Sequence, residues 1–247
     1  MTFKDHFSGQ AAEYARFRPA YPEALFDYLA SVVSNRNAAW DCATGSGQAA
    51  IALAKHFQSV IATDASEKQI ANAQPADRVH YRVAPAEKSG IDSNSIDLIA
   101  VAQALHWLDL PNFYAEAKRV LKPGGLIAVW NYDFLQVNPA IDAMVNRFYH
   151  DIVGPFWPPE RRVIEEGYTT LAFPFHEITP PAFRIEVRWG LPQLIGYLET
   201  WSATQRFIAA NELDPVTLIA DELGTAWNDG DSTKLVVWPL TLRIGRV

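Results

Sequence analysis

The chain has 247 residues, 49% of them hydrophobic and 20% charged, which is typical of one large globular domain or of a domain with an inserted lid. Its formal charge of −7 at pH 7 disfavours a nucleic-acid partner, because the phosphate backbone repels an acidic surface. Cys42 is the single cysteine, so we expect no internal disulfide, and the six histidines lack metal-ligand spacing, so we expect no metal site. No stretch of the sequence is long and apolar enough to span a bilayer, so we expect a cytoplasmic protein without a membrane segment.

The first 36 residues form the N-terminal segment. A short helix is expected after the polar start, followed by an elbow that contains proline. A second helix is expected from about Pro22, with Leu25, Phe26 and Leu29 spaced to share one face.

Residues 37–132 alternate between strand and helix patterns. The expected strands are "AAWDCA" (38–43), "SVIATD" (59–64), "RVHYRVA" (78–84), "SIDLIAVAQAL" (95–105) and "LIAVWNY" (126–132), and the helices are "GQAAIALAKHF" (47–57), "SEKQIANA" (66–73) and "PNFYAEAKRVL" (111–121). Strands that alternate with helices pair in parallel, with helices on both faces. The sequence therefore predicts a doubly wound, Rossmann-like α/β core.

The pattern changes in residues 133–180, where prolines and aromatic residues gather around one helical stretch that begins near 139. An insertion after the fifth strand predicts a lid over the strand ends, where open α/β sheets bind ligands. Residues 181–247 are expected to complete the sheet, with a strand at 183–189, helices at about 191–210 and 214–227, and a last strand in which Pro239 indicates an edge or bulged position.

The glycine turn "GSGQAA" joins the first core strand to its helix. Gly45, Gly47 and the small Ala50 satisfy the loose dinucleotide fingerprint, and Asp64 ends the next strand 17 residues after Gly47, where it could hold ribose hydroxyls. A dinucleotide, however, lays an anionic pyrophosphate against the helix N-terminus, beside which the carboxylate of Asp41 would be unfavourable. Asp41 favours a cationic ligand instead, such as the sulfonium and ammonium groups of S-adenosylmethionine.

"DCATGSG" resembles the first motif of class I S-adenosylmethionine-dependent methyltransferases, with Ala43 and Thr44 in place of a glycine and a cysteine. "ATDAS", "APAEK", "AQALHWLD" and "AEAKRVLKPGGLIAVWNY" are similar to the later motifs of that family, in family order across residues 40–132. "YARFRPAYP" and "WPLTLRIGRV" resemble the small-molecule branch that includes trans-aconitate methyltransferase. The resemblance implies a seven-stranded, mostly parallel sheet with the last strand antiparallel, an inserted helical lid, and an N-terminal segment that covers the cofactor.

The resemblance also implies a cofactor site for S-adenosylmethionine. Its residues would be Tyr14, Arg18, Asp41, Ala43, Gly45, Gly47, Asp64, Ala65, Gln69, Ala86, Glu87, Ala102 and Gln103. Arg18 would pair with the carboxylate of the methionine part and Asp64 with the ribose hydroxyls. Cys42 fits a small buried hydrophobic residue better than a nucleophile.

A small-molecule methyl acceptor would lie on the other side of the transferred methyl group. Candidate acceptor residues are Tyr21, His106, Trp107, Trp130 and Trp157. A carboxylate acceptor would need no base and could be held by Arg161 or Arg162, whereas a phenol or amine would need a base, for which His106 is the candidate. O-methylation is the favoured reaction. A nicotinamide-dependent oxidoreductase and a non-catalytic nucleoside-binding protein stay open as alternatives, and the sequence indicates no oligomeric state.

Overall fold

The computed structural model describes residues 17–132, 134–228 and 232–247. The predicted first helix and Tyr14 lie outside these ranges. The strands are β1 (Ala38–Cys42), β2 (Ser59–Asp64), β3 (Val79–Val83), β4 (Ile96–Ala102), β5 (Leu121–Tyr132), β6 (His176–Ile178), β7 (Phe183–Trp189) and β8 (Lys234–Arg246). The α-helices are α2 (Glu23–Val32), α3 (Gln48–Ala54), α4 (Glu67–Asn72), α5 (Leu110–Val120), α6 (Pro139–Arg147), α7 (Arg161–Glu165), α8 (Leu191–Glu199), α9 (Ser202–Asn211) and α10 (Ala220–Trp227).

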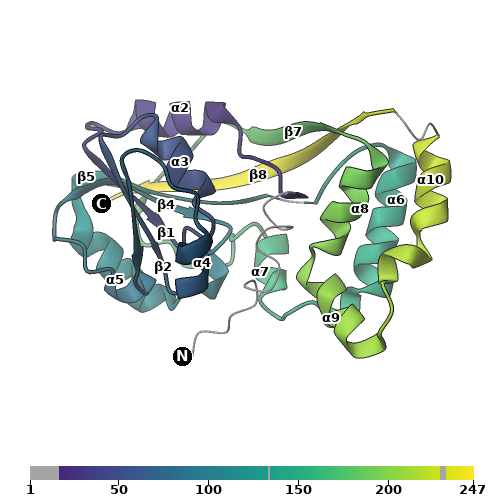
Figure 1. Cartoon of the computed structure of the whole chain (residues 1–247). Helices are drawn as coiled ribbons and strands as arrows, with labels where there is room; N and C mark the ends of the chain where they lie inside the picture. The colour runs from purple at the N-terminus through teal and green to yellow at the C-terminus, as the bar shows by residue number, and fades with distance from the viewer. Residues whose placement is uncertain (1–16, 133, 229–231) are drawn as a thin grey trace.

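One mixed sheet organises the molecule, in the order β3-β2-β1-β4-β5-β8-β6, with β7 also paired to β8 (Figure 1). The strands β1 to β5 are parallel, and β8 runs antiparallel to β5. This arrangement confirms the predicted Rossmann-like core with an antiparallel last strand. The order reverses between β1 and β4, the position at which doubly wound sheets bind ligands beyond the carboxyl ends of the strands.

Side chains of the central strands alternate between two buried clusters. Ala39, Leu98 and Ala128 belong to the cluster under α2 and α3, whereas Trp40 and Ile99 belong to the cluster under α5. Both faces of a parallel sheet must be covered, so the strands read as continuous apolar runs. The buried face of α2 carries Leu25, Phe26 and Leu29, as the spacing predicted.

Two details of the sheet differ from the prediction. The short strand β6 was not expected, because its three residues lie in a segment dominated by proline and aromatic residues. The strands β6 and β7 pair with successive parts of the same edge of β8, so they share one position in the strand order, and the sheet has eight strands where seven were predicted. Pro239 lies in an internal strand and not in an edge strand, so only the bulged position of the two that were expected fits the structure. Pro239 pairs with Arg184 of β7. On its other side the pairing stops at Leu240 and resumes, with a shifted register, at the bridge between Gln136 and Val237.

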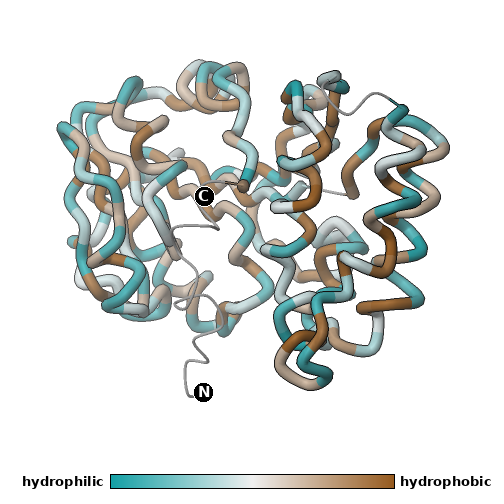
Figure 2. Tube along the Cα trace, turned by 45° about the vertical axis from the view of Figure 1, so that its right-hand side comes forward, coloured by the Kyte–Doolittle hydropathy of each residue, from teal (hydrophilic) through white to brown (hydrophobic). Residues whose placement is uncertain are grey.

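A helical layer beside the sheet contains α6, α8, α9 and α10 (Figure 1). The helix α6 from the predicted insertion shares one hydrophobic cluster with α8, α10 and the strand β7, in which Trp201, Trp227 and Trp238 are buried. Hydrophobic stretches run through the sheet part and through this helical layer (Figure 2). The two expected C-terminal helices are each divided, one between α8 and α9 and the other between the 3-10 turn η5 (Pro215–Leu218) and α10.

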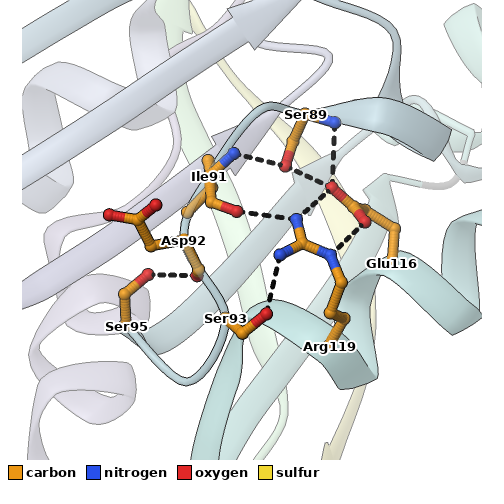
Figure 3. A network of polar contacts seen from close by, with 7 residues as sticks. All are labelled: Ser89, Ile91, Asp92, Ser93, Ser95, Glu116 and Arg119. Atoms are coloured by element: carbon orange, nitrogen blue, oxygen red, sulfur yellow. Dashed lines mark hydrogen bonds and ion pairs between the residues drawn. The ribbon is translucent and has the colours of Figure 1, made fainter.

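A polar network ties α5 to the loop before β4 (Figure 3). Glu116 accepts hydrogen bonds from the backbone and hydroxyl of Ser89 at 2.9 and 2.6 Å and from Nε of Arg119 at 2.7 Å. Arg119 in turn donates to the carbonyl of Ile91 and the hydroxyl of Ser93. The Arg119 guanidinium lowers the pKa of Glu116 from 4.5 to about 2, so the carboxylate is strongly stabilised in the folded chain.

Replacing Glu116 with glutamine is expected to lower the free energy of unfolding by about 1–3 kcal/mol at pH 7, the cost of losing charged, buried hydrogen bonds. The pKa is lower in the folded state, so this stabilisation is present above pH 4.5 and is lost as the pH falls toward 2. Urea unfolding of both proteins at pH 7, 5 and 3 should show a difference that shrinks at pH 3. Glu160→Gln, at an exposed position, is the control; a difference that does not change with pH would contradict the account.

Candidate functional site

The carboxyl ends of β1 and β4 are followed by strained residues. Ala43, directly after β1, has φ of +56°, and Gln103, directly after β4, has φ of +57°. A left-handed conformation costs an L-residue roughly 1–2 kcal/mol. Such strain gathers at ligand sites, and here it marks the point where the strand order reverses. Ala43 occupies the position where the resembling motif has a glycine, which explains why glycine suits that position.

The predicted glycine turn forms the start of α3. Gly45 and Gly47 have φ of +55° and +88°, a region open to glycine and rarely to other residues. A Cβ on Gly45 would meet no atom of the described residues within 4 Å, so these residues leave that side of the turn open. A Cβ on Gly47 would lie 2.1 Å from Oη of Tyr81, which packs against the turn from β3. Gly47 is therefore required by both its conformation and its neighbour.

Asp41 is buried at the end of β1, with 1% of its surface exposed. Oδ2 accepts a hydrogen bond from Oγ1 of Thr44 at 2.5 Å, whereas Oδ1, among the described residues, is buried without a hydrogen-bond partner. Burial raises the pKa of Asp41 from 3.8 to about 7, and the Thr44 hydroxyl and the Ala50 amide offset the rise only in part. A cation brought to this carboxylate would stabilise its charged form.

Asp64 ends β2 and holds the backbone around it. Oδ2 accepts the Gly45 N–H and Oδ1 accepts the Ser66 N–H, both at 2.9 Å, so one carboxylate links the glycine turn to the start of α4. Ser66 caps α4 by accepting the N–H of Gln69 at 3.3 Å, as its capping-box pattern predicted. Ala65 is exposed at this edge and Gln69 is half-buried.

The third motif forms the short 3-10 turn η1 (Ala86–Lys88) after β3. Ala86 is buried against the cluster under α5. Glu87 accepts the backbone N–H of Asp109 at 3.0 Å and so joins η1 to the start of α5. Ala102 and Gln103 lie at the end of β4 and are half-buried, beside the turn at Ala43.

Arg18, Tyr21 and Trp130 lie where the N-terminal segment meets the sheet. Arg18 donates to Oη of Tyr132 at 2.6 Å, and its guanidinium lies 5.2 Å from the centre of the Tyr197 ring of α8. The Tyr21 ring meets Trp130 edge-on at 5.6 Å. Trp130 is fully buried in the cluster under α2, and its Nε1 has no hydrogen-bond partner in the described parts of the chain. Arg18 therefore bridges the sheet and the helical layer.

His106 lies in the 3-10 turn η2 (Leu105–Trp107) that follows β4. Its Nδ1 is 2.9 Å from Oη of Tyr168, and its ring lies 4.6 Å from the ring of Trp107 at an angle of 49°; Trp107 is 37% exposed. Burial, together with the nearby charge of Arg161, lowers the pKa of His106 from 6.5 to about 3. A base is most effective with a pKa near the working pH, so this environment does not suit the predicted base role.

Arg161 begins α7, between the sheet and the helical layer in Figure 1. Its Nε donates to Oη of Tyr149 at 2.7 Å, and its guanidinium lies 4.7 Å from the centre of the Trp157 ring. Tyr149 also donates to Glu165. Within the described ranges no hydrogen bond is formed by either Nη of Arg161. Arg162 is exposed instead and pairs with Glu166 at 2.9 Å.

The predicted acceptor residues are not brought together as one group. His106 contacts Tyr168 on the α5 face and Trp157 contacts Arg161, whereas Tyr21 and Trp130 pack on the α2 face. We name His106, Tyr149, Trp157, Arg161 and Tyr168 the interlayer cluster. Its tyrosines gave no sequence signal, because their roles depend on contacts across 12 to 62 residues of chain.

The described residues contain no group of three His, Cys, Asp or Glu side chains that could hold a metal ion. No helix found in those same ranges has the length and apolar character of a membrane span. Cys42 is fully buried, and burial holds the pKa of its thiol well above the usual value, so it has the character of a buried hydrophobic residue.

The sheet order, the glycine turn and the two aspartates together define a nucleoside-binding Rossmann-like enzyme, and residues 40–129 match the methyltransferase domain family. A Dictyostelium discoideum protein that is named as a methyltransferase is 37% identical to this chain over 240 residues. The aligned residues cover 95% of this chain and 91% of that protein. The chain therefore belongs to the S-adenosylmethionine-dependent methyltransferases.

Solved structures and other relatives agree with this family. The structure of a protein assigned as a type II methyltransferase from Anaeromyxobacter dehalogenans superimposes with a TM-score of 0.89 at 44% identity, covering 93% of this chain and 97% of that one. A methyltransferase of uncharacterised function from Mycobacterium bovis is 32% identical over 127 residues, about half of each protein (51%). The finer resemblance to trans-aconitate methyltransferase stays a prediction.

The residues present fit the family's cofactor. Oδ1 of Asp41 is buried and has no hydrogen-bond partner in residues 17–132, 134–228 and 232–247, so it suits a cationic group and would be unfavourable beside a pyrophosphate. The open side of Gly45 permits close approach to the backbone, and the Asp64 carboxylate stands at the next strand end, where ribose hydroxyls would bind. This charge pattern separates the site from that of a nicotinamide enzyme.

Proposed function

We propose that the chain transfers a methyl group from S-adenosylmethionine to an oxygen atom of a small molecule, most favourably a carboxylate oxygen. Asp41, Gly45, Gly47 and Asp64 would hold the cofactor, with the other residues of the predicted cofactor site around them. When bound, the cofactor supplies an electrophilic methyl group on a sulfonium. The residues of the chain then have to align an acceptor oxygen with that group, and positioning alone can supply roughly 7–11 kcal/mol in favourable cases.

Arg161 carries the proposal of a carboxylate acceptor. Its Nε is held by Tyr149 and its Cζ lies 4.7 Å from the centre of the Trp157 ring, so the guanidinium is fixed by two contacts. Both Nη groups form no hydrogen bond with described residues and can donate to an anion. A fixed guanidinium binds a carboxylate through two parallel hydrogen bonds, which orients the oxygen atoms as well as neutralising them.

The environment of His106 supports the same choice. A carboxylate is already ionised near pH 7 and needs no base, whereas a phenol or amine acceptor would need one. With its pKa lowered to about 3 by burial, His106 holds a proton only weakly and is a poor base for such an acceptor. A hydroxyl acceptor remains the second candidate and would require another group to take the proton.

We also propose that the helical layer selects the acceptor. The predicted lid, residues 133–180, contributes Tyr149, Trp157 and Arg161, and α8 contributes Tyr197 beside Arg18. The N-terminal segment would cover the cofactor from the side of Arg18. In this assignment the sheet edge binds the cofactor, whereas the second layer provides the cationic and aromatic groups that meet the acceptor.

Methyl transfer from labelled S-adenosylmethionine to a panel of small carboxylic acids, their amides and matching phenols tests the proposal. Methyl esters are the expected products, and amides are expected to be inert. Arg161→Met should lower kcat/KM about 10- to 30-fold, mainly through KM, because one charge-assisted bidentate contact is lost. Arg162→Met removes an exposed arginine one residue away and should leave kcat/KM unchanged; equal losses, or equal transfer to phenols, would refute the carboxylate assignment.

A further inference from the structure

We infer that Tyr168 is a positioning residue that holds His106 in the tautomer with its hydrogen on Nε2, so that His106 donates a hydrogen bond to the methyl acceptor and does not take a proton from it. The tautomer follows from the geometry of the two side chains. The contact with the acceptor rests on the proposed function. Neither role is indicated by any sequence motif.

The hydroxyl of Tyr168 determines the direction of the hydrogen bond. Tyr168 is fully buried, so its O–H cannot donate to bulk water and must donate inside the protein. Among the described residues, the acceptor within reach of Oη is Nδ1 of His106, at 2.9 Å. The backbone N–H groups of Leu105 and His106 act to lower the pKa of Tyr168, as donors that face its oxygen do, so they compete for the oxygen and leave the hydroxyl hydrogen for Nδ1.

The state of the His106 ring then follows. Burial and the charge of Arg161 both disfavour the imidazolium, so the ring is neutral and carries one hydrogen. Because Nδ1 accepts from Tyr168, that hydrogen lies on Nε2. Nε2 forms no hydrogen bond with residues in the described ranges and is therefore available as a donor to a ligand.

Tyr168 is itself held in place at some cost. Gly167 and Tyr168 have φ of +59° and +60°, so an aromatic L-residue adopts the left-handed conformation. Nη1 of Arg243 donates to the Tyr168 carbonyl at 2.8 Å, and Arg243 is in turn paired with Glu177 at 2.8 Å. The backbone N–H of Tyr168 donates to the Val163 carbonyl at 3.1 Å. Strain that is held by several contacts is typical of residues whose position serves a ligand site.

Two donors would therefore meet an acceptor oxyanion, Nε2–H of His106 and the Nη groups of Arg161. Both belong to the interlayer cluster, and the charge of Arg161 acts on both His106 and Tyr168. Donors that are oriented before the ligand arrives cost no reorganisation when it binds. Such an arrangement favours carboxylate recognition and works against proton abstraction.

Nitrogen NMR of the full chain labelled with 15N-histidine tests the tautomer without any substrate. The His106 signals are assigned by their loss in His106→Gln. In the natural protein Nδ1 should be unprotonated and Nε2 protonated; in Tyr168→Phe both tautomers should be populated. Tyr114→Phe, which removes a different buried hydroxyl hydrogen bond to the Ala172 carbonyl, is the matched control and should leave the signals unchanged.

A protonated Nδ1 in the natural protein would overturn the inference, as would an unchanged tautomer in a folded Tyr168→Phe protein. The wild-type spectrum decides the matter even if that variant does not fold. The donor role is tested separately, by measuring kcat with the carboxylic acid of the panel that is methylated most efficiently. His106→Gln keeps an N–H near the Nε2 position and should lose at most about tenfold in kcat, whereas a base would lose 10²- to 10⁴-fold on the same change. A panel without any methylated acid would refute the proposed function and leave the tautomer result intact.

Discussion

Asp64→Ala is expected to weaken binding of S-adenosylhomocysteine at least 100-fold, a loss of about 2.7 kcal/mol or more. The carboxylate holds the N–H groups of Gly45 and Ser66, and it would bind both ribose hydroxyls of the cofactor. A hydrogen bond to a charged group contributes about 1.5–3 kcal/mol, so losing two of them accounts for the magnitude. Isothermal titration calorimetry at constant pH measures the change.

Two further variants separate the effect on the ligand from an effect on the turn. Asp64→Asn keeps an acceptor for one backbone N–H but removes the charge, and it should lose about tenfold or more. Asp77→Ala removes an exposed carboxylate in the turn before β3 and should bind normally. His106→Ala should also bind the cofactor normally, because our proposal places His106 on the acceptor side. If Asp64→Ala and His106→Ala lost affinity equally, the division into cofactor and acceptor sides would be wrong.

Affinity for S-adenosylmethionine is expected to rise with pH through about 7, by up to tenfold for each pH unit below that value, and to level off above it. The pKa of Asp41 is about 7 in the ligand-free chain because of burial, so the carboxyl is protonated at lower pH. A cationic ligand binds the charged form better, and the proton must leave first. Calorimetry at pH 6 in two buffers of different ionisation enthalpy should detect the released proton.

The same pKa predicts a stability profile of the ligand-free chain. The folded pKa of Asp41 is raised above the unfolded value of 3.8, so its contribution to stability is fully present below about pH 4 and is lost as the pH rises toward 7. The total loss is up to about 4 kcal/mol by linkage. Urea unfolding between pH 4 and 8 should show this decline in the wild type and a flatter profile in Asp41→Asn.

A matched control is available at the opposite end of the sheet. Asp97 is also buried, but it pairs with Lys122 at 2.7 Å and accepts two backbone N–H groups. Asp97→Asn should therefore keep the pH dependence of cofactor affinity, whereas Asp41→Asn should abolish it and bind about tenfold more weakly at pH 8. A wild-type affinity that stays flat between pH 5.5 and 8 would exclude Asp41 as the linked group.

Local patterns were enough to predict the core of the fold. The alternation of apolar strands and amphipathic helices in residues 37–132 requires a parallel sheet covered on both faces, because neither element can bury its apolar side alone. Glycine turns and caps gave the ends of elements, as Ser66 does for α4. The helix α2 was found from its apolar spacing, and its buried residues are those expected.

The pairing of β6 and the association of α6 with α8 and α10 were not predictable in the same way. The strand β6 has three residues and gains its register only from β8, which lies more than 55 residues later in the chain. The helices α6 and α10 form one cluster because β8 leads from that layer back into the sheet. Contacts of this kind have no local period, so their signal is absent from any short window of sequence.

The sequence by itself determined the family and the α/β core, and it supplied the residues that we propose for the cofactor. These aspartates and glycines stand at strand ends, and parallel strands bring their carboxyl ends to one edge. The residues that we propose for the acceptor could be selected only from the tertiary structure. It separated Trp130 from His106, left Arg162 exposed while enclosing Arg161, and placed the hydroxyl of Tyr168 on His106. The physical reason is that burial and hydrogen-bond direction, which set the charge and tautomer of these side chains, depend on residues brought together across the whole chain.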